Sequence, residues 1–241
     1  MRLDKALGWA GMTRSEAKKA VRAGRVTVDG RIATDAGMDP GAGEILLDGE
    51  PISRPGHTHL MVNKPAGVIT ATEDARWNTV MDLVPQEMRR RGLGPIGRLD
   101  RDVTGLVLLT TDGQLAHRLI SPRHDAPKTY IAQVEGTLNP EHASAFAGGI
   151  ALSDFVAKPA EMRILRSGEG GSLAEVVLTE GKFHQVKRMF AAIGHPVIAL
   201  TRIRLADVSL DPSLPMGGVR FLTPEEITRL YRAAGMTQEE T

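Results

Sequence analysis

The most constraining stretch of this sequence is the segment Gly97–Gly105, which leads directly into the apolar run Leu106–Leu109. It places one carboxylate, Asp100, between two arginines in a turn bounded by glycines. Glycines let a backbone adopt positive φ or approach another segment closely, and a strand that leaves such a turn is a rigid base for a reactive side chain. Neighbouring positive charge favours the ionised carboxylate. The segment therefore predicts either a fixed nucleophile or base, or an ordinary surface turn of salt bridges.

A second carboxylate, Asp102, lies two residues after Asp100. We expect the side chains of Asp100 and Asp102 to point to opposite sides of this segment. We therefore expect only one of the two carboxylates to enter a cleft. This arrangement also argues against a glycosidase, which needs two carboxylates on either side of one bond.

Four further blocks of sequence lie on both sides of this segment. They are Asn63–Gly67, Thr111–Arg118, Ser121–His124 with Lys128–Tyr130, and Glu180–Phe190. In order and spacing, the set resembles the pseudouridine synthases of the ribosomal small subunit (Rsu) type over almost the whole chain. The resemblance implies isomerisation of a uridine to pseudouridine in ribosomal RNA. That reaction involves no redox change and needs neither a nucleotide cofactor nor a metal.

The resemblance also implies roles for individual residues. Asp100 corresponds to the catalytic aspartate, which either attacks the sugar C1′ atom or removes a proton from C2′. Tyr130 corresponds to the tyrosine whose ring stacks on the uracil. Lys187 corresponds to the basic partner that keeps the aspartate ionised in a cleft poor in water, where an unpaired carboxylate is costly. Arg98 stands where an arginine holds the target base out of the RNA stack, and Lys64–Pro65 is expected to shape the cleft wall.

The N-terminal region is basic although the whole chain has a formal charge of only +1. Residues 1–31 contain eight basic and three acidic side chains, which is typical either of polyanion binding or of a solvated face. Thr13–Glu16 has the form of a capping box, and the helix that it opens contains Lys18, Lys19 and Arg22. Two small helices followed by short strands resemble the ribosomal-protein-type (alpha-L) RNA-binding domain. We therefore expect these three cations to contact RNA phosphates with little choice of sequence.

The boundary between two domains is predicted at Pro51–Thr58, which contains two prolines and a glycine without apolar periodicity. We predict an RNA-binding domain over residues 1–50, a linker over 51–58 and a catalytic domain over 59–241. In the second domain, expected strands and helices, including a helical turn at Thr79–Val84, alternate without a regular βαβ repeat. This pattern favours a mixed α+β fold. The resemblance implies a long, mostly antiparallel sheet with the active-site cleft across it.

The helix expected after Gly181 has two chemically different sides at about 100° per residue. The basic side contains His184, Lys187 and Arg188, and it faces either solvent or the cleft. The opposite side is apolar and is expected to pack into the core. Its residues are Val186, Met189, Phe190 and Ile193.

Several classes of protein are excluded or disfavoured by what the sequence lacks. Without cysteine, the chain has no disulfides, thiolate zinc sites or cysteine nucleophile, which fits a reducing compartment. The chain has no G-x-x-x-x-G-K or H-E-x-x-H motif and no G-x-G-x-x-G that follows an expected strand, and His57 and His59 have no third ligand near them in sequence. We therefore predict no cofactor and no metal. No apolar run approaches the roughly 18 residues that span a bilayer, so we expect a cytoplasmic protein without membrane contact, and nothing predicts a protein partner.

Three functions compete on the sequence alone. The first is a uridine isomerase for ribosomal RNA, with 16S preferred and 23S as the alternative. The second is a non-catalytic factor for ribosome assembly, against which the set of Asp100, Tyr130 and Lys187 argues. The third is a carboxylate enzyme for small molecules, against which the basic N-terminal helices argue. One departure from the resemblance is Ala206, which stands where relatives commonly have glycine and makes the local turn uncertain.

Overall fold

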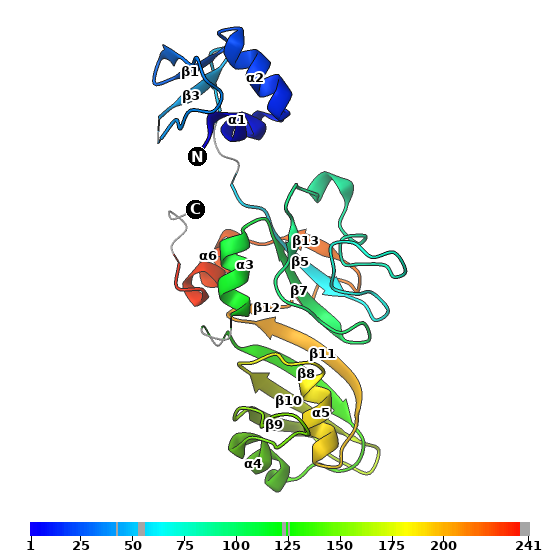
Figure 1. Ribbon diagram of the computed structural model, residues 1–241. Coiled ribbons are helices and arrows are strands. Elements are labelled where there is room, and N and C mark those ends of the chain that lie inside the picture. Colours follow the sequence, from blue (N-terminus) through cyan, green and yellow to red (C-terminus); the bar gives the residue numbers. More distant parts are fainter. Residues whose placement is uncertain (42, 53–55, 122–123, 125, 237–241) are drawn as a thin grey trace. The chain divides into compact units, whose positions relative to one another are not determined.

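The computed structural model describes residues 1–41, 43–52, 56–121, 124 and 126–236. The chain forms two compact units, Met1–Gly56 and His57–Thr241 (Figure 1). Part of the predicted linker, residues 53–55, lies outside the described residues.

The N-terminal unit pairs a small helical layer with a four-stranded antiparallel sheet in the order β2-β1-β3-β4. Its helices are α1 (Leu3–Ala6), the 3-10 helix η1 (Leu7–Ala10) and α2 (Arg14–Arg22). Its strands are β1 (Val26–Val28), β2 (Arg31–Ile32), β3 (Ile45–Leu47) and β4 (Glu50–Pro51). The helices and the sheet enclose a separate small core, which includes Leu3, Leu7 and Val26.

Local sequence signals account for the boundaries of these elements. The capping box that the sequence predicts at the start of α2 is present, because Thr13 and Glu16 each accept a hydrogen bond from the backbone of the other. The hairpin turn between β1 and β2 places Asp29 at φ 49° and Gly30 at φ 74°. Asp and Gly tolerate this left-handed region, so the dipeptide fixes the hairpin.

The second unit is built on a nine-stranded sheet with the path β13-β5-β7-β11-β8-β10-β9. Strands β6 and β12 attach to β7 and β11. The strands are β5 (His59–Lys64), β6 (Gly94–Pro95), β7 (Thr104–Thr110), β8 (Lys128–Val134), β9 (Glu161–Arg166), β10 (Ser172–Leu178), β11 (Val197–Leu205), β12 (Val208–Ser209) and β13 (Val219–Phe221). Among these described strands only β7 and β11 pair in parallel, so the expected α+β fold with a mostly antiparallel sheet is confirmed.

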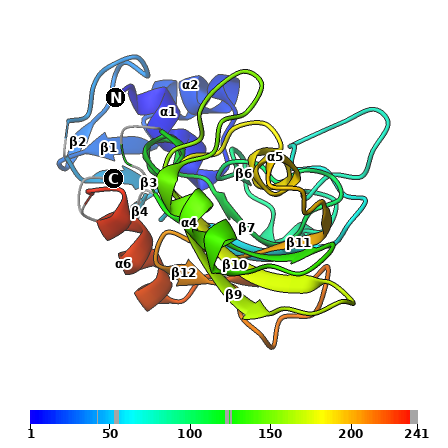
Figure 2. The same cartoon turned by 90° about the horizontal axis from the view of Figure 1, so that it is seen from below.

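Short helices pack against the faces of this sheet and contribute side chains to its two cores. They are the 3-10 helix η2 (Gln86–Met88), α3 (Gly113–Ile120), α4 (Pro140–Gly148), α5 (Gln185–Ala192) and α6 (Pro224–Ala233). Helix α3 packs on α6 (Figure 1), α4 packs on β9, and α5 lies against β11 (Figure 2). The apolar side predicted for α5 is buried, whereas the predicted helical turn at Thr79–Val84 is wrong: the segment forms hydrogen-bonded turns and a bridge between Ile69 and Thr79.

The sheet is buried on both faces around β5 and β7, which explains their continuous apolar sequences. One core includes Val62, Val107 and Phe190. The other includes Met61 and Leu108, whose neighbours in sequence point to the first core. Alternate residues of each strand thus enter different cores, as the two-residue period of a strand requires.

The two halves of the sheet meet where β7 runs parallel to β11. Gly105 has φ +100°, and a Cβ atom there would lie 2.3 Å from the carbonyl oxygen of Arg202. The hydroxyls of Thr104 and Thr201 lie 2.8 Å apart at the same place. Because only glycine permits this approach, the position of β7 relative to β11 depends on Gly105.

The turn between β11 and β12 contains Ala206, where the resemblance made the geometry uncertain. Its φ is 50°, so alanine occupies the left-handed conformation that glycine would adopt more easily. The flanking residues Leu205 and Val208 still pair. The turn is therefore retained.

Candidate active site

The turn that contains Asp100 is fixed through the backbone of its two neighbours. On one side, the Thr70 hydroxyl accepts from the Leu99 amide at 3.1 Å and donates to the Leu99 carbonyl at 3.0 Å. On the other side, the Arg101 carbonyl accepts from the Gly67 amide at 2.8 Å. The carboxylate of Asp100 therefore projects from a backbone that is held on both sides.

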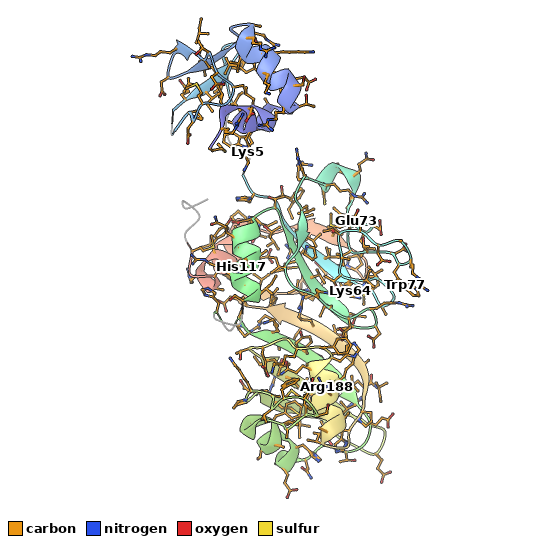
Figure 3. The ribbon with its side chains drawn as sticks, in the orientation of Figure 1. Lys5, Lys64, Glu73, Trp77, His117 and Arg188 are labelled. Atoms are coloured by element: carbon orange, nitrogen blue, oxygen red, sulfur yellow. The ribbon has the colours of Figure 1, made fainter. Side chains whose placement is uncertain are left out.

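Lys64 supports the same turn from inside the protein (Figure 3). Its side chain is fully buried, and its Nζ donates to the carbonyl oxygens of Pro65, Val68 and Arg101 at 2.9, 2.6 and 3.2 Å. Burial lowers the pKa of Lys64 to about 8, although the nearby charges of two aspartates oppose the shift. Lys64 thus contributes to the cleft through its ammonium group, whose hydrogen bonds connect the Asp100 turn to the end of β5.

The second wall of the site is the turn that precedes α5. His184, the N-cap residue, has φ 50°, a left-handed conformation that is uncommon for a residue with a side chain. The turn is closed by Gln185, whose Oε1 accepts from the Lys182 amide and whose Nε2 donates to Glu180. Such strained backbone persists where the surroundings over-determine it, and it is common at functional sites.

Two basic side chains from this wall reach the Asp100 carboxylate. The Lys187 Nζ lies 3.5 Å from Asp100 Oδ2, and the His184 Nε2 lies 3.6 Å from the same oxygen. Residues 100 and 187 are far apart in sequence, and the sheet brings them together. Of the basic side predicted for α5, His184 and Lys187 thus face the site.

Arg188 turns away from this group. It bonds to Asp154 and, at 3.1 Å, to the Ser153 hydroxyl (Figure 3). The basic side predicted for α5 therefore divides between the Asp100 site and a loop outside it.

Lys187 is shared between two carboxylates, which corrects the expectation from the sequence. Its Nζ lies 2.7 and 2.8 Å from the oxygens of Asp102, closer than its contact with Asp100. The expectation that the two carboxylates point to opposite sides is wrong. Residues 100–103 form a turn, with the Val103 amide bonded to the Asp100 carbonyl, and both carboxylates lie within reach of Lys187. The hydrogen bond from Lys187 lowers the pKa of Asp102 below its usual value.

The two carboxylates nevertheless differ in their surroundings. The side chain of Asp100 is 32% exposed and lines a pocket of about 70 Å³, whereas that of Asp102 is 72% exposed and is not among the lining residues. Tyr130, on β8, is 8% exposed and lines the same pocket. Arg98 and Lys187 line it as well. The structure thus brings together four residues that the sequence selected: Arg98, Asp100, Tyr130 and Lys187.

A larger cavity of about 350 Å³ adjoins this pocket and shares Arg98 and Tyr130 with it. Its lining contains basic side chains and a single acidic residue, Glu180. One of the basic residues, Arg202, was not selected from the sequence. It pairs with Tyr130 across β8 and β11, is 2% exposed, and donates from Nε to the Leu106 carbonyl at 2.9 Å. An arginine at a core-facing position of an apolar strand was the signal that could have identified it.

The other three predicted contacts with substrate, Lys18, Lys19 and Arg22, are exposed on α2 of the N-terminal unit. Within the described part of the chain, none of the three forms an ion pair within 4.0 Å. Arg14 on the same helix differs, because its Nε donates to the buried Asp4 at 2.9 Å. The three cations are thus available to an anionic partner.

Some expectations cannot be followed in the structure. Pro122 and Arg123, in the block Ser121–His124, lie outside the described residues. Among the residues that are described, no group of three or more His, Cys, Asp or Glu side chains could hold a metal ion. Over the same residues, no helix has the length and apolar character required to cross a membrane.

Comparison with known proteins agrees with this architecture. Residues 58–192 match the family model described as RNA pseudouridylate synthase, and residues 1–46 match that of the S4 domain. An uncharacterized RNA pseudouridine synthase of Bacillus subtilis (strain 168) is 44% identical over 232 residues, 94% of this chain and 97% of that protein. The ribosomal small subunit pseudouridine synthase A of Escherichia coli (strain K12) is 39% identical over 233 residues, 94% and 98% of the two chains. A crystal structure of a pseudouridylate synthase has a TM-score of 0.66 at 36% identity and covers 95% of this chain and 99% of its own.

These similarities extend through both units and nearly the full length of each relative. The family model and the similar proteins therefore define an isomerase that acts on RNA. More specifically, the chain belongs to the pseudouridine synthase family and has an S4 RNA-binding domain at its N-terminal end. The family and the enzyme class expected from the sequence are confirmed.

Proposed function

We propose that this pseudouridine synthase isomerises a specific uridine of 16S ribosomal RNA. The similarity that supports the choice of RNA is to enzymes named for the ribosomal small subunit in Escherichia coli and in Vibrio parahaemolyticus, at 39% and 40% identity. Isomerisation of the same kind in 23S ribosomal RNA is the alternative. The single observation behind the chemistry is the Asp100 carboxylate, which shares one pocket with Tyr130 and lies 3.5 Å from Lys187.

Asp100 is the proposed catalytic residue. Its carboxylate is either a nucleophile toward the ribose C1′ atom or a base toward the C2′ proton, and both roles require the ionised form. Lys187 and His184 lie 3.5 and 3.6 Å from it, so the carboxylate has two basic partners in the pocket. Bonds from Thr70, Gly67 and Lys64 to the adjacent backbone would keep the carboxylate oriented as the base leaves the sugar, rotates and rejoins through C5.

The uridine must leave the RNA stack to reach this pocket. Extrusion of a base costs a few kcal/mol, and stacking and polar contacts in the pocket offset this cost. We propose that the Tyr130 ring stacks on the uracil and that Arg98, which is exposed and lines both cavities, stabilises the extruded nucleotide. The base would then meet Asp100 away from the duplex.

Affinity for the RNA would come largely from the S4 domain. Lys18, Lys19 and Arg22 present positive charge along one helix, which suits phosphate contacts that position the enzyme without selecting a sequence. Choice of the uridine would then depend on the shape of the folded RNA around the catalytic unit.

The substrate is tested by treating a 16S transcript, a small-subunit precursor particle and a 23S transcript with the purified protein. Pseudouridine is then mapped at nucleotide resolution in each RNA. We expect one modified position in 16S RNA, in the transcript or in the precursor, and none in 23S RNA. Modification of 23S RNA alone would contradict the assignment to the small subunit.

A further inference from the structure

Aromatic side chains are scarce in this protein and unevenly distributed. The chain has nine of them: two Trp, two Tyr and five Phe. Three are exposed, namely Trp77 at 43%, Phe183 at 74% and Phe221 at 49%. A single exposed apolar side chain needs no explanation. Two of these three, however, contact residues of the Asp100 site.

Phe183 lies in the turn that forms one wall of the site. Its ring stacks on that of His184 with a centroid distance of 3.8 Å and an interplanar angle of 18°. The Nε2 atom of His184 in turn lies 3.6 Å from Asp100. One face of the phenyl ring is therefore covered by a residue of the site, and most of the remaining ring surface is open to solvent.

Trp77 has a similar arrangement on a different segment. The guanidinium carbon of Arg101, the residue after Asp100, lies 3.5 Å from the centroid of its ring. Its loop is fixed by the Asp74 carboxylate, which accepts from the amides of Arg76 and Trp77 at 2.8 and 2.9 Å. In Figure 3, Trp77 lies at the outer edge of the catalytic unit, whereas Lys64 lies within it. The indole is thus supported from the active-site side and exposed on the other.

We propose that Phe183 and Trp77 are stacking platforms for unpaired nucleobases adjacent to the extruded uridine. The inference rests on the proposed function, because extrusion of one base leaves its neighbours without a stacking partner. Proteins recognise unstacked bases by stacking them on aromatic rings and arginine planes, which accepts any base. A basic residue beside each ring, His184 or Arg101, suits the phosphates that join these nucleotides.

Kinetics with 16S RNA as the substrate tests the role of each platform. We expect Phe183→Ala and Trp77→Ala each to raise KM about ten-fold, since stacking of one base contributes that much affinity or more. The kcat should change less than two-fold, because the lost contact is the same in the ground and transition states. Phe183→Trp should keep KM near the wild-type value. Phe221→Ala, an exposed phenylalanine on β13 outside the site, is the matched control.

A binding measurement provides a second readout that needs no turnover. The chain has two tryptophans, so Trp9→Phe leaves Trp77 as the sole indole reporter. We expect a single-stranded oligouridylate to quench Trp77 emission, and Phe183→Ala in this background to weaken the binding about ten-fold. Anisotropy of a labelled oligouridylate shows independently whether the RNA binds. If the RNA binds and Trp77 emission stays constant, the role of Trp77 is overturned.

An unchanged KM in Phe183→Ala would overturn the role of Phe183. If kcat decreased at this constant KM, the ring would act only by orienting His184. An absence of pseudouridine in wild-type reactions with 16S RNA would instead contradict the proposed substrate, and quenching of Trp77 by oligouridylate would still support stacking.

Discussion

Substitution of Gly105 by alanine tests how the fold positions the active site. Gly105 lies where β7, which follows the Asp100 turn, meets β11, which pairs with the strand of Tyr130. A Cβ atom at this position would lie 2.3 Å from the Arg202 carbonyl oxygen and 3.0 Å from the Arg202 amide nitrogen. Neither backbone atom can move without displacing β11. Gly105→Ala should therefore separate the two halves of the sheet.

The magnitude follows from two contributions. The left-handed φ of +100° would strain alanine by about 1–3 kcal/mol. Overpacking against a backbone adds about 1–3 kcal/mol. Gly92 provides the matched control, because its φ is +82° and nothing lies within 4 Å of the Cβ that alanine would add. Gly92→Ala should lower the free energy of unfolding by the backbone strain alone. Gly105→Ala should lower it by about 4 kcal/mol, at least about 1 kcal/mol more than Gly92→Ala.

Urea unfolding of the two variants measures this difference in the free energy of unfolding. The midpoint and slope are taken from the transition of the catalytic unit. In a thermal scan, 4 kcal/mol corresponds to a decrease in Tm of about 8–16 °C for a unit of this size. Pseudouridine formation should decrease in Gly105→Ala below its new Tm, because Tyr130 and Asp100 belong to different halves. Equal stability of the Gly105→Ala and Gly92→Ala variants would refute the reasoning about the close approach.

Two further predictions concern acid stability and RNA binding. Burial, and secondarily the charge of the neighbouring His57, lowers the pKa of His59 from 6.5 to about 4, so the neutral ring is favoured in the folded state. As the pH falls, the unfolded chain therefore binds the additional proton before the folded chain does. The free energy of unfolding should decrease between pH 6.5 and pH 4, by about 2 kcal/mol at pH 5. Chemical denaturation at several pH values measures this decrease, and His59→Gln should make the free energy of unfolding less dependent on pH. In the S4 domain, changing Lys18, Lys19 and Arg22 to glutamate should weaken RNA binding and reduce the slope of log K against log salt by about 2–3. Filter binding over a range of salt concentrations checks the second prediction, and an unchanged slope would exclude these side chains as phosphate contacts.

Local structure was predictable from the sequence wherever neighbouring residues determine it. The capping box predicted at Thr13–Glu16 depends on contacts within a few residues, and it is present. The apolar side of α5 followed from the period of the helix. These features need no knowledge of the tertiary fold.

The candidate site was only partly predictable because its geometry depends on distant segments. Asp100, Tyr130 and Lys187 were selected by resemblance, and no pattern in the sequence gives the 3.5 Å contact between Asp100 and Lys187, which lie 87 positions apart. The closer contact of Lys187 with Asp102 was missed because the two carboxylates were expected on opposite sides, whereas residues two apart share a face even on a strand. The bonds from Thr70 and Lys64 to the turn were missed for a different reason: they join loops that only the folded sheet brings together.

Pseudouridine formation by Asp100→Asn and Asp102→Asn, measured side by side on the same 16S RNA, tests the central claim most directly. Both substitutions remove one negative charge beside Lys187, so they affect its surroundings in a similar way. We predict that Asp100→Asn binds the RNA and forms no pseudouridine, whereas Asp102→Asn stays active. An active Asp100→Asn together with an inactive Asp102→Asn would contradict the account.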